Sequence, residues 1–363
     1  MASAQPAPAF ESAAIDLPTW ARDFIPTLLA NQAESDRLAK IPPDILAQLE
    51  AAGIYKMTIP KAYGGLESSV TTWMKTVTEL GRGDAGVAWA VTLVTACNWM
   101  ISGLYPKHVA DEVLATDNVR AAGVFSGRAC KARPAEGGIF VEKGLWFFNS
   151  GVYQANWDLL GVPRFDEKGE PTTPGIALVP MSDVNILGDW DTSGMRGSGS
   201  STVSMENVFI PHDRIVGLMD CNQGRQPKTF PELDLYHSSF APLMVIILTF
   251  PVLGLGMHMI ETFLETMPKR DIRLTFYDKQ SEAPVTHLNL GEASAKVDTA
   301  KYIVERACRE IDEWAARHEN MPLQDRARIC RDAAFADQLV WQAVDLLATY
   351  TAFRDLLVET GLA

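Results

Sequence analysis

Apolar residues recur at helical spacing in the first third of the chain. Three segments show this pattern: residues 17–32, 43–52 and 70–82. Residues 85–101 are almost all small or apolar, which is typical of a buried helix. We therefore predict a helical domain over residues 17–119, and we interpret residues 1–16, which lack the regions of a signal peptide, as a flexible N-terminal arm.

The pattern changes near Arg120, where short apolar runs begin to alternate with turn residues. Dipeptides typical of hairpin connections occur at three places: residues 137–138, 168–169 and 174–175. Runs of this length and spacing indicate strands of a small barrel or a sandwich. We therefore expect a β domain over residues 120–232.

Helical spacing returns after Pro231 and continues to the end of the chain. We expect four helical segments: residues 237–267, 283–318, 324–349 and 351–359. Long helices with short connections favour an antiparallel bundle over residues 233–363. The order helical, β, helical lacks the βαβ alternation of a Rossmann sheet and defines an α+β fold.

One apolar run needs to be tested as a membrane span. Residues 238–260 contain no Asp, Glu, Lys or Arg, and the run is long enough to cross a bilayer. Two prolines and two glycines interrupt it, however, and no cluster of positive residues flanks it. These features favour a helix buried in the centre of a bundle, and no association with membranes.

Composition narrows the classes of protein further. The chain has 363 residues, 47% of them hydrophobic, which is typical of a globular protein. The net charge of −13 argues against a nucleic-acid partner. The five cysteines are scattered without zinc-ligand spacing, which fits a reduced cytoplasm and predicts no metal site.

Two polar segments could carry chemistry. Residues 197–202 are rich in glycine and serine but lack the Gly-Lys-Ser/Thr of a phosphate-binding loop, so they indicate either a polar turn or a contact to phosphate or flavin. Residues 144–151 place three aromatics before an Asn-Ser pair, which fits an edge of the β core or the wall of a planar ring. A Ser-His-Asp triad is not evident, because no histidine lies between residues 109 and 211.

Three segments carry a resemblance to a known family. Residues 35–65, 79–91 and 189–216 resemble the acyl-CoA dehydrogenase superfamily. The resemblance implies an N-terminal helical domain, a middle β-barrel domain and a C-terminal antiparallel helical bundle, assembled as a homotetramer. It also implies a flavin between the β domain and the C-terminal helices, where relatives carry about one further terminal segment that completes the flavin site.

Two chemistries occur in that superfamily. Dehydrogenation of an acyl-CoA thioester needs a carboxylate base, but residues 238–260 hold none, and near the C-terminus only Glu359 is a candidate. The two-component aromatic monooxygenases instead react reduced flavin with O2 to a C4a-hydroperoxyflavin. The sequence favours this second chemistry: hydroxylation of an aromatic or heteroaromatic small molecule, with reduced FMN or FAD supplied by a separate NAD(P)H-flavin reductase. An acyl-CoA dehydrogenase and a non-catalytic family member remain as alternatives.

The resemblance to the monooxygenases is carried by the middle domain. Those enzymes have a motif in which an aromatic residue precedes Ser-Ser-Gly and a tryptophan follows six residues later. This motif is similar to Phe148-Asn149-Ser150-Gly151 and Trp157 in this chain. This likeness implies that the Ser150 hydroxyl lies near flavin N5, in a dry pocket that has no carboxylate base.

The site residues implied by the resemblance fall into three groups. The catalytic candidates are Ser150 and Asn98. The expected cofactor contacts are Ser126, Phe147, Phe148, Asn149, Ser150, Thr192, Ser198 and Arg273. The expected substrate contacts are Trp99, Gln154, Trp157 and Met195. Asn98 and Gln154 stand near positions where histidines are usual, and Arg273 either reaches the flavin across a subunit interface or lies on the surface.

Overall fold

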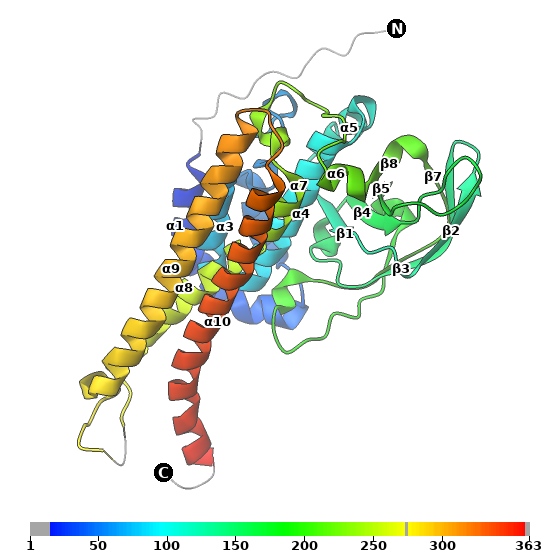
Figure 1. The fold of residues 1–363 in the computed structure, drawn as a ribbon. Helices are drawn as coiled ribbons and strands as arrows, with labels where there is room; N and C mark the ends of the chain where they lie inside the picture. The colour runs from blue at the N-terminus through cyan, green and yellow to red at the C-terminus, as the bar shows by residue number, and fades with distance from the viewer. Residues whose placement is uncertain (1–14, 273–274, 360–363) are drawn as a thin grey trace.

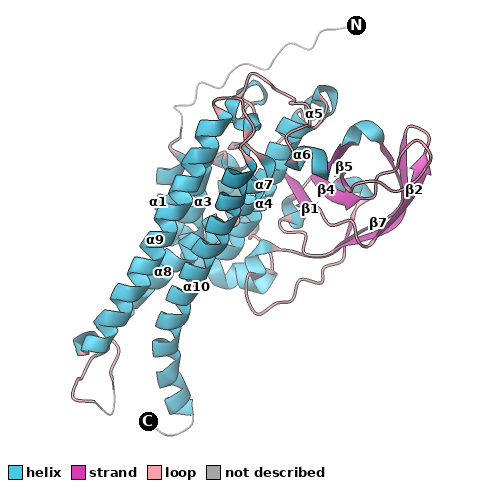
Figure 2. Cartoon of the chain, viewed as in Figure 1, coloured by secondary structure: helices cyan, strands magenta, loops and turns pink. Residues whose placement is uncertain are grey.

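Helices and strands separate into different parts of the molecule (Figures 1 and 2). The structure is a computed structural model that describes residues 15–272 and 275–359. Residues 1–14 of the predicted arm, and Arg273, lie outside the described residues. Helices from both ends of the chain pack together, and the strands lie to one side of them (Figure 1).

The N-terminal helices begin and end where local chemistry dictates. They are α1 (Leu17–Leu38), α2 (Pro43–Ala51), α3 (Val70–Gly83), α4 (Ala85–Leu104) and α5 (Lys107–Leu114). Asp84 ends α3 in an extended conformation and also caps α4, because its carboxylate accepts hydrogen bonds from the backbone N–H groups of Gly86 (2.9 Å) and Val87 (3.0 Å). This single residue therefore sets the turn between the two most buried helices.

The eight described strands form two four-stranded sheets. One has the order β1 (Ala121–Val124), β4 (Trp157–Val162), β5 (Gly175–Pro180), β8 (Ile215–Gly217), and the other β2 (Cys130–Ala135), β3 (Gly138–Trp146), β7 (Val203–Pro211), β6 (Asn185–Ile186). The first sheet is mixed because β1 pairs in parallel with β4, and the second is antiparallel.

The strand pattern left a barrel or a sandwich open, and the resemblance implied a β-barrel domain; the structure shows two separate sheets and not one continuous barrel. Between the described strands the two sheets share no ladder, and each ends at a very short strand, β6 or β8. The inner faces are joined by side chains instead: Val141 and Met205 of one sheet share an apolar cluster with Leu160 and Val179 of the other. The β domain is therefore a sandwich, which has no need to close through hydrogen bonds.

The short helix α6 (Leu218–Asn222) directly follows β8, and the C-terminal part consists of α7 (Phe240–Ile246), α8 (Thr249–Thr266), α9 (Pro284–Ala315) and α10 (Leu323–Glu359). The single helix predicted over residues 237–267 is broken at Ile247 and Leu248. Pro251 explains the break, because it has no N–H to donate to the carbonyl of Ile247, four residues earlier. The two segments predicted at 324–349 and 351–359 form one helix, α10, since neither glycine nor proline separates them.

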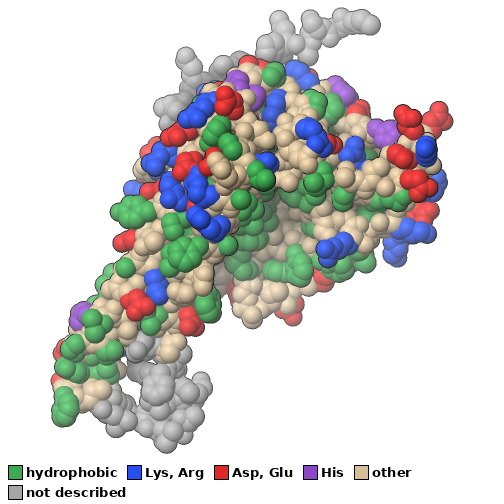
Figure 3. Space-filling model, in the orientation of Figure 1, with side chains coloured by type: hydrophobic (Ala, Val, Ile, Leu, Met, Phe, Trp, Pro, Cys, Tyr) green, Lys and Arg blue, Asp and Glu red, His purple; other side chains and the backbone are tan. Residues whose placement is uncertain are grey.

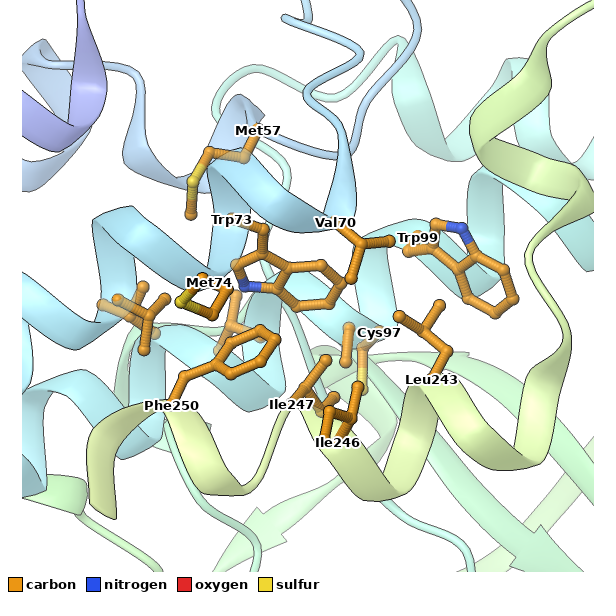
Figure 4. Packing of buried hydrophobic residues seen from close by; sticks show 14 of the residues in the cluster. Met57, Val70, Trp73, Met74, Cys97, Trp99, Leu243, Ile246, Ile247 and Phe250 are labelled. Carbon is orange, nitrogen blue, oxygen red and sulfur yellow. The ribbon is translucent and has the colours of Figure 1, made fainter. Parts of the chain in front are cut away.

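Two described helical segments are long and apolar enough to cross a membrane, judged by length and composition. They are α4 and the α7–α8 segment Phe240–Thr266, and the apolar 18-residue stretch within each is 89% and 50% buried respectively. In Figure 4 side chains of both segments meet in one core, where Leu243 and Ile246 lie close to Trp99 and Cys97.

Two glycines bring α3 and α8 into backbone contact. A Cβ atom on Gly254 would lie 2.3 Å from the carbonyl oxygen of Thr78, and one on Gly81 would lie 2.8 Å from that of Pro251. Trp73 and Phe250 pack edge to face beside this crossing, with ring centroids 6.2 Å apart (Figure 4). The close approach fixes α8 against α3, and with it the position of the first turn of α8.

We expect Gly254→Ala to lower the free energy of unfolding by about 1–3 kcal/mol, because the added methyl would force the two backbones apart. Gly291→Ala is the matched control, since Gly291 is an exposed glycine of α9 with open space around its Cα. That substitution should raise the free energy of unfolding by about 0.5–1 kcal/mol. Urea denaturation measures both, and equal effects of the two variants would contradict the close helix contact.

Candidate functional site

A pocket of about 490 Å³ opens where the helices meet the β domain. Its walls come from α4, α8 and two loops, one after β3 and one before β7: Ala85, Trp89, Leu93, Phe148, Ser150, Trp190, Met195, Ser198, Ser200, Pro251, Val252 and Leu255. On the face shown in Figure 3, hydrophobic side chains gather in a hollow between the helices and the sheets. The described lining residues include no charged side chain and no histidine.

The α4 wall follows directly from helical geometry. Ala85, Trp89 and Leu93 are spaced four residues apart, so they lie on one face of the helix. The cap by Asp84 fixes where that face begins, and burial raises the pKa of the Asp84 carboxyl. The opposite wall is the first turn of α8, which starts just after the break at Ile247.

A chain of hydrogen bonds runs along the polar side of the pocket. Trp89 Nε1 donates to Ser150 Oγ (3.0 Å), Ser150 Oγ lies 2.7 Å from Ser200 Oγ, and Ser200 Oγ lies 2.6 Å from Ser198 Oγ. All three serines are buried. A hydroxyl can donate once and accept twice, so Ser150 has one further bond to offer after Trp89 and Ser200 are satisfied.

The direction of that further bond can reverse. If Ser200 donates to Ser150, the Ser150 hydroxyl is left as a donor. If Ser150 donates to Ser200, it is left as an acceptor, and Ser198 carries the remaining proton. The three hydroxyls can therefore present either a donor or an acceptor to a ligand at Ser150 without moving an atom heavier than hydrogen.

Two lining residues adopt left-handed backbone conformations that side chains rarely take. Phe148 has φ 64° and Met195 has φ 58°. Backbone bonds between the two loops support these conformations: Asn149 N–H donates to the carbonyl of Ser201 (3.1 Å) and Gly151 N–H to that of Ser198 (2.9 Å). Strain of this kind concentrates at functional sites, because surrounding contacts must maintain it.

Aromatic rings form one rim of the pocket. Trp190 and Phe148 meet edge to face with centroids 6.2 Å apart, and Trp190 Nε1 donates to the carbonyl of Met195 (3.2 Å). Phe148 is 70% exposed, so one of its sides faces solvent. The rim is therefore held together but accessible.

Four of the predicted site residues line this pocket: Phe148, Ser150, Met195 and Ser198. Three other predicted flavin contacts do not. Phe147 is exposed beside Phe148, Ser126 is exposed in the loop after β1, and the Thr192 hydroxyl donates to the carbonyl of Gly194 (2.7 Å). Their roles toward a flavin remain predictions.

The structure places Asn98 and Trp99, predicted as a catalytic and a substrate residue, in the core of the fold. Asn98 is fully buried, its Nδ2 donates to the carbonyls of Tyr55 (2.9 Å) and Val119 (3.1 Å), and its Oδ1 accepts from the N–H of Ala121 (3.1 Å). Trp99 donates to the carbonyl of Leu235 (3.0 Å) within the core shown in Figure 4. Both side chains join segments of the fold and lie away from the pocket lining.

Gln154 and Trp157 are also placed outside the lining. Gln154 is buried behind the loop that carries Ser150, and Trp157 Nε1 donates to the hydroxyl of Thr116 (3.2 Å) at the start of β4. Asn149, predicted to touch the flavin, points its amide to the buried carboxyl of Asp158, with Nδ2 2.6 Å from Oδ2. These three side chains are buried inside the domain and do not belong to the pocket lining.

Sequence reasoning missed several lining residues. Trp89 could have been found from the four-residue spacing of Ala85, Trp89 and Leu93, and Ser200 belongs to the Gly-Ser segment already considered as a ligand contact. Trp190 and the α8 residues gave no signal, because their place depends on how distant segments pack. Among the described residues no cluster of His, Cys, Asp and Glu could hold a metal ion.

Family models match both helical parts of the chain. Residues 15–105 match the N-terminal domain of acyl-CoA dehydrogenase, and residues 246–351 match its C-terminal domain. The chain belongs to the acyl-CoA dehydrogenase superfamily.

Similar proteins lie in the monooxygenase branch of this superfamily. The oxygenase component of p-hydroxyphenylacetate 3-hydroxylase from Acinetobacter baumannii is 25% identical over 92% of this chain and 79% of its own length. The oxygenase subunit HsaA of a flavin-dependent monooxygenase from Rhodococcus jostii is 25% identical over 89% and 84%. The structure of XiaF from Streptomyces sp. with FADH2 and glycerol is 26% identical, covers 91% of this chain and 83% of its own, and superposes with a TM-score of 0.82.

These relatives confirm the prediction of a flavin-dependent oxidoreductase of the monooxygenase type within the acyl-CoA dehydrogenase superfamily.

We expect Asn98→Leu to lower the free energy of unfolding by about 2–4 kcal/mol, because the N–H of Ala121 and two buried carbonyls lose their partner. Thr92→Val, on the same helix, removes a bond from the Thr92 hydroxyl to the helix's own carbonyl of Ala88 and should cost about 1 kcal/mol or less. Urea denaturation measures both. Loss of flavin-dependent activity without loss of stability would show instead that Asn98 acts at the site.

Proposed function

We propose that this protein is the oxygenase component of a two-component monooxygenase, which uses reduced flavin, FMN or FAD, and O2 to hydroxylate an aromatic or heteroaromatic molecule. A separate NAD(P)H-flavin reductase supplies the flavin. The observation that carries the proposal is the pocket itself. Its described lining is aromatic and aliphatic, its polar groups are a chain of serine hydroxyls, and it contains no carboxylate.

The lining suits a flavin ring. Trp89, Phe148 and Trp190 supply flat apolar walls, and Ser150 supplies one hydrogen bond whose direction can reverse. That reversal matters because N5 of a flavin accepts a hydrogen bond when oxidised and donates one when reduced. When bound, the reduced flavin supplies the activation of O2. The protein's part is to hold the ring, to match its N5 hydrogen bond and to exclude water.

The same lining selects the class of substrate. An anionic aromatic acid would need a cationic partner inside the pocket, because a buried unpaired charge is costly. The described lining offers none. We therefore propose a neutral planar aromatic or heteroaromatic substrate, held between apolar side chains of α4 and α8.

Dehydrogenation of an acyl thioester is the weaker alternative. It needs a carboxylate close to the substrate, and the first acid on α8, Glu261, is engaged by Arg82, with Nη2 2.6 Å from Oε1. Glu359, the other candidate, is the last residue of α10, where side chains are not described. A non-catalytic member would bind flavin in neither redox state.

Two experiments, both started from anaerobic protein, separate these functions. Oxidised flavin and protein are mixed with acyl-CoAs, and bleaching of the flavin absorbance would establish the dehydrogenase and overturn the monooxygenase. Reduced flavin and protein are then mixed with O2 in a stopped-flow instrument. A transient absorbance that differs from both the reduced and the oxidised flavin, and that outlasts the reaction of free flavin, supports the monooxygenase.

We expect Ser150→Ala to shorten the life of that transient about tenfold, because a hydrogen bond worth about 1–1.5 kcal/mol is lost at N5. Ser204→Ala is the control, since Ser204 lies on β7 outside the pocket and pairs there through its backbone. Stopped-flow absorbance measures the decay. Equal decay in wild type and Ser150→Ala would remove Ser150 from the flavin site.

We also propose that the chain forms a homotetramer in the cytoplasm. The first turns of α9 and the end of α10 project beyond the body of the molecule (Figure 1). Large apolar side chains are exposed on the C-terminal helices: Leu255, Leu264, Leu288, Tyr302, Phe335 and Trp341. Contact with further copies of the chain would cover them. The cysteines among the described residues are free thiols, which fits a reducing compartment.

We expect Leu288→Asp to reduce the oligomer, because a charge would enter the apolar contact near the projecting end of α9. Leu323→Asp is a matched control: both leucines are 73% exposed, but Leu323 lies at the opposite end of the α9–α10 pair. Light scattering after size-exclusion chromatography gives the mass of each variant. An unchanged mass for Leu288→Asp would place the interface elsewhere.

A further inference from the structure

A buried carboxyl–amide pair lies directly behind the pocket wall. Asn149 and Asp158 are both fully buried, and Asn149 Nδ2 donates to Asp158 Oδ2 over 2.6 Å. Asp158 is on β4, whereas Asn149 belongs to the loop after β3. The next residue of that loop is Ser150, whose hydroxyl faces the pocket. The pair therefore ties the sheet to the residue that contacts the ligand.

The second oxygens of both side chains, Asn149 Oδ1 and Asp158 Oδ1, have no partner among the described residues. Both are acceptors when the carboxyl is ionised, so neither can satisfy the other. A proton on the Asp158 carboxyl would supply the missing donor to Asn149, and the pair would then be joined by two hydrogen bonds.

The surroundings favour that proton. Burial raises the pKa of the Asp158 carboxyl to about 7. The ionisable group that faces it from α4 is the thiol of Cys97, and burial holds the pKa of this thiol well above its usual range, so it brings no charge. In the described structure no cation is paired with Asp158 to stabilise its ionised form.

The loop needs such an anchor. Phe148 (φ 64°) and Gly151 (φ 77°) both take left-handed conformations on either side of Asn149 and Ser150. Two backbone bonds to Ser201 and Ser198 hold this loop from the pocket side. The Asn149 side chain connects this loop to β4 through Asp158. Without that connection, the Ser150 hydroxyl can shift away from Trp89 and Ser200.

We propose that Asp158 is a positioning residue, which in its neutral acid form holds Asn149 by two hydrogen bonds and thereby fixes the Ser150 hydroxyl at the pocket wall. The role of Ser150 toward flavin rests on the proposed function. The protonation of Asp158 does not, so the two can be tested separately.

The first experiment tests the protonation state of Asp158 through the stability of the protein, without any measurement of activity. The unfolded chain ionises Asp158 near its ordinary pKa of about 3.9, whereas the folded chain does so near 7. The folded state therefore binds one more proton between these values, and its stability falls as pH rises through that window and levels off above it. Asp158→Asn cannot titrate. The melting temperature of wild type minus that of Asp158→Asn should fall from pH 4 to about pH 7 and stay constant above it.

The second experiment tests whether Asp158 positions Ser150, and it does so through the decay of the transient absorbance seen when reduced flavin reacts with O2. In wild type its decay should accelerate several-fold as pH rises from 6 to 8, because ionisation removes one bond to Asn149. Asp158→Asn should decay at the low-pH wild-type rate throughout, since a neutral amide keeps the loop in place. Asn149→Ala should decay fast at every pH. The double variant Asn149→Ala/Ser150→Ala should be no faster than Ser150→Ala alone, because Asn149 acts through Ser150.

Asp337→Asn is the matched control. Asp337 lies on α10, burial raises its pKa to about 6, and its Oδ1 also lacks a partner. This variant should change the pH dependence of melting but not that of the transient.

If the melting temperature depends on pH in the same way in wild type and in Asp158→Asn, the proposal is overturned, whatever the enzymatic activity of the variant. A transient whose pH profile is the same in wild type and Asp158→Asn would overturn the link to Ser150. If wild type forms no transient, the proposed function fails, and the melting experiment still decides the state of Asp158.

Discussion

The helix α4 carries no charged residue from Ala85 to Leu104, and almost all of it is buried. Such a helix is stable only if each of its polar side chains finds a partner inside the protein. Its threonines and Ser102 bond back to their own helix. Its longer polar side chains bond outward instead, and each one joins α4 to a different part of the chain.

These outward bonds organise the molecule. Asn98 holds the segment at Tyr55 and the entry to β1, Trp99 holds the segment before α7, and Trp89 holds the loop that carries Ser150. The N-terminal helices, the β sandwich and the C-terminal bundle are thus fastened to one helix. The pocket lies where the bond from Trp89 to Ser150 meets the first turn of α8. The same helix, α4, therefore forms the buried core and one wall of the pocket.

Residue spacing predicted most of this architecture, because helical periodicity is local. The helices of both ends and the interval of strands are visible in the pattern, and so are Phe148 and Ser150, which follow an aromatic-polar motif. The partners of Asn98 could not be predicted, since they lie 43 and 21 positions away along the chain. Asn98 was expected to be catalytic because it stands near a position where relatives carry a histidine, although its hydrogen bonds are all used within the fold. The strand pattern left barrel and sandwich open for a related reason: strand lengths do not reveal whether the edges of two sheets pair with each other.

The exposure of Phe148 bears on how a ligand enters and leaves the pocket. Its ring forms part of the pocket rim, yet most of its surface is in contact with solvent. A ligand that stacks on it can therefore leave without separating the domains. If the protein is the proposed oxygenase, flavin is loaded and released at each turnover as a co-substrate would be, and the concentration of free reduced flavin then controls the rate.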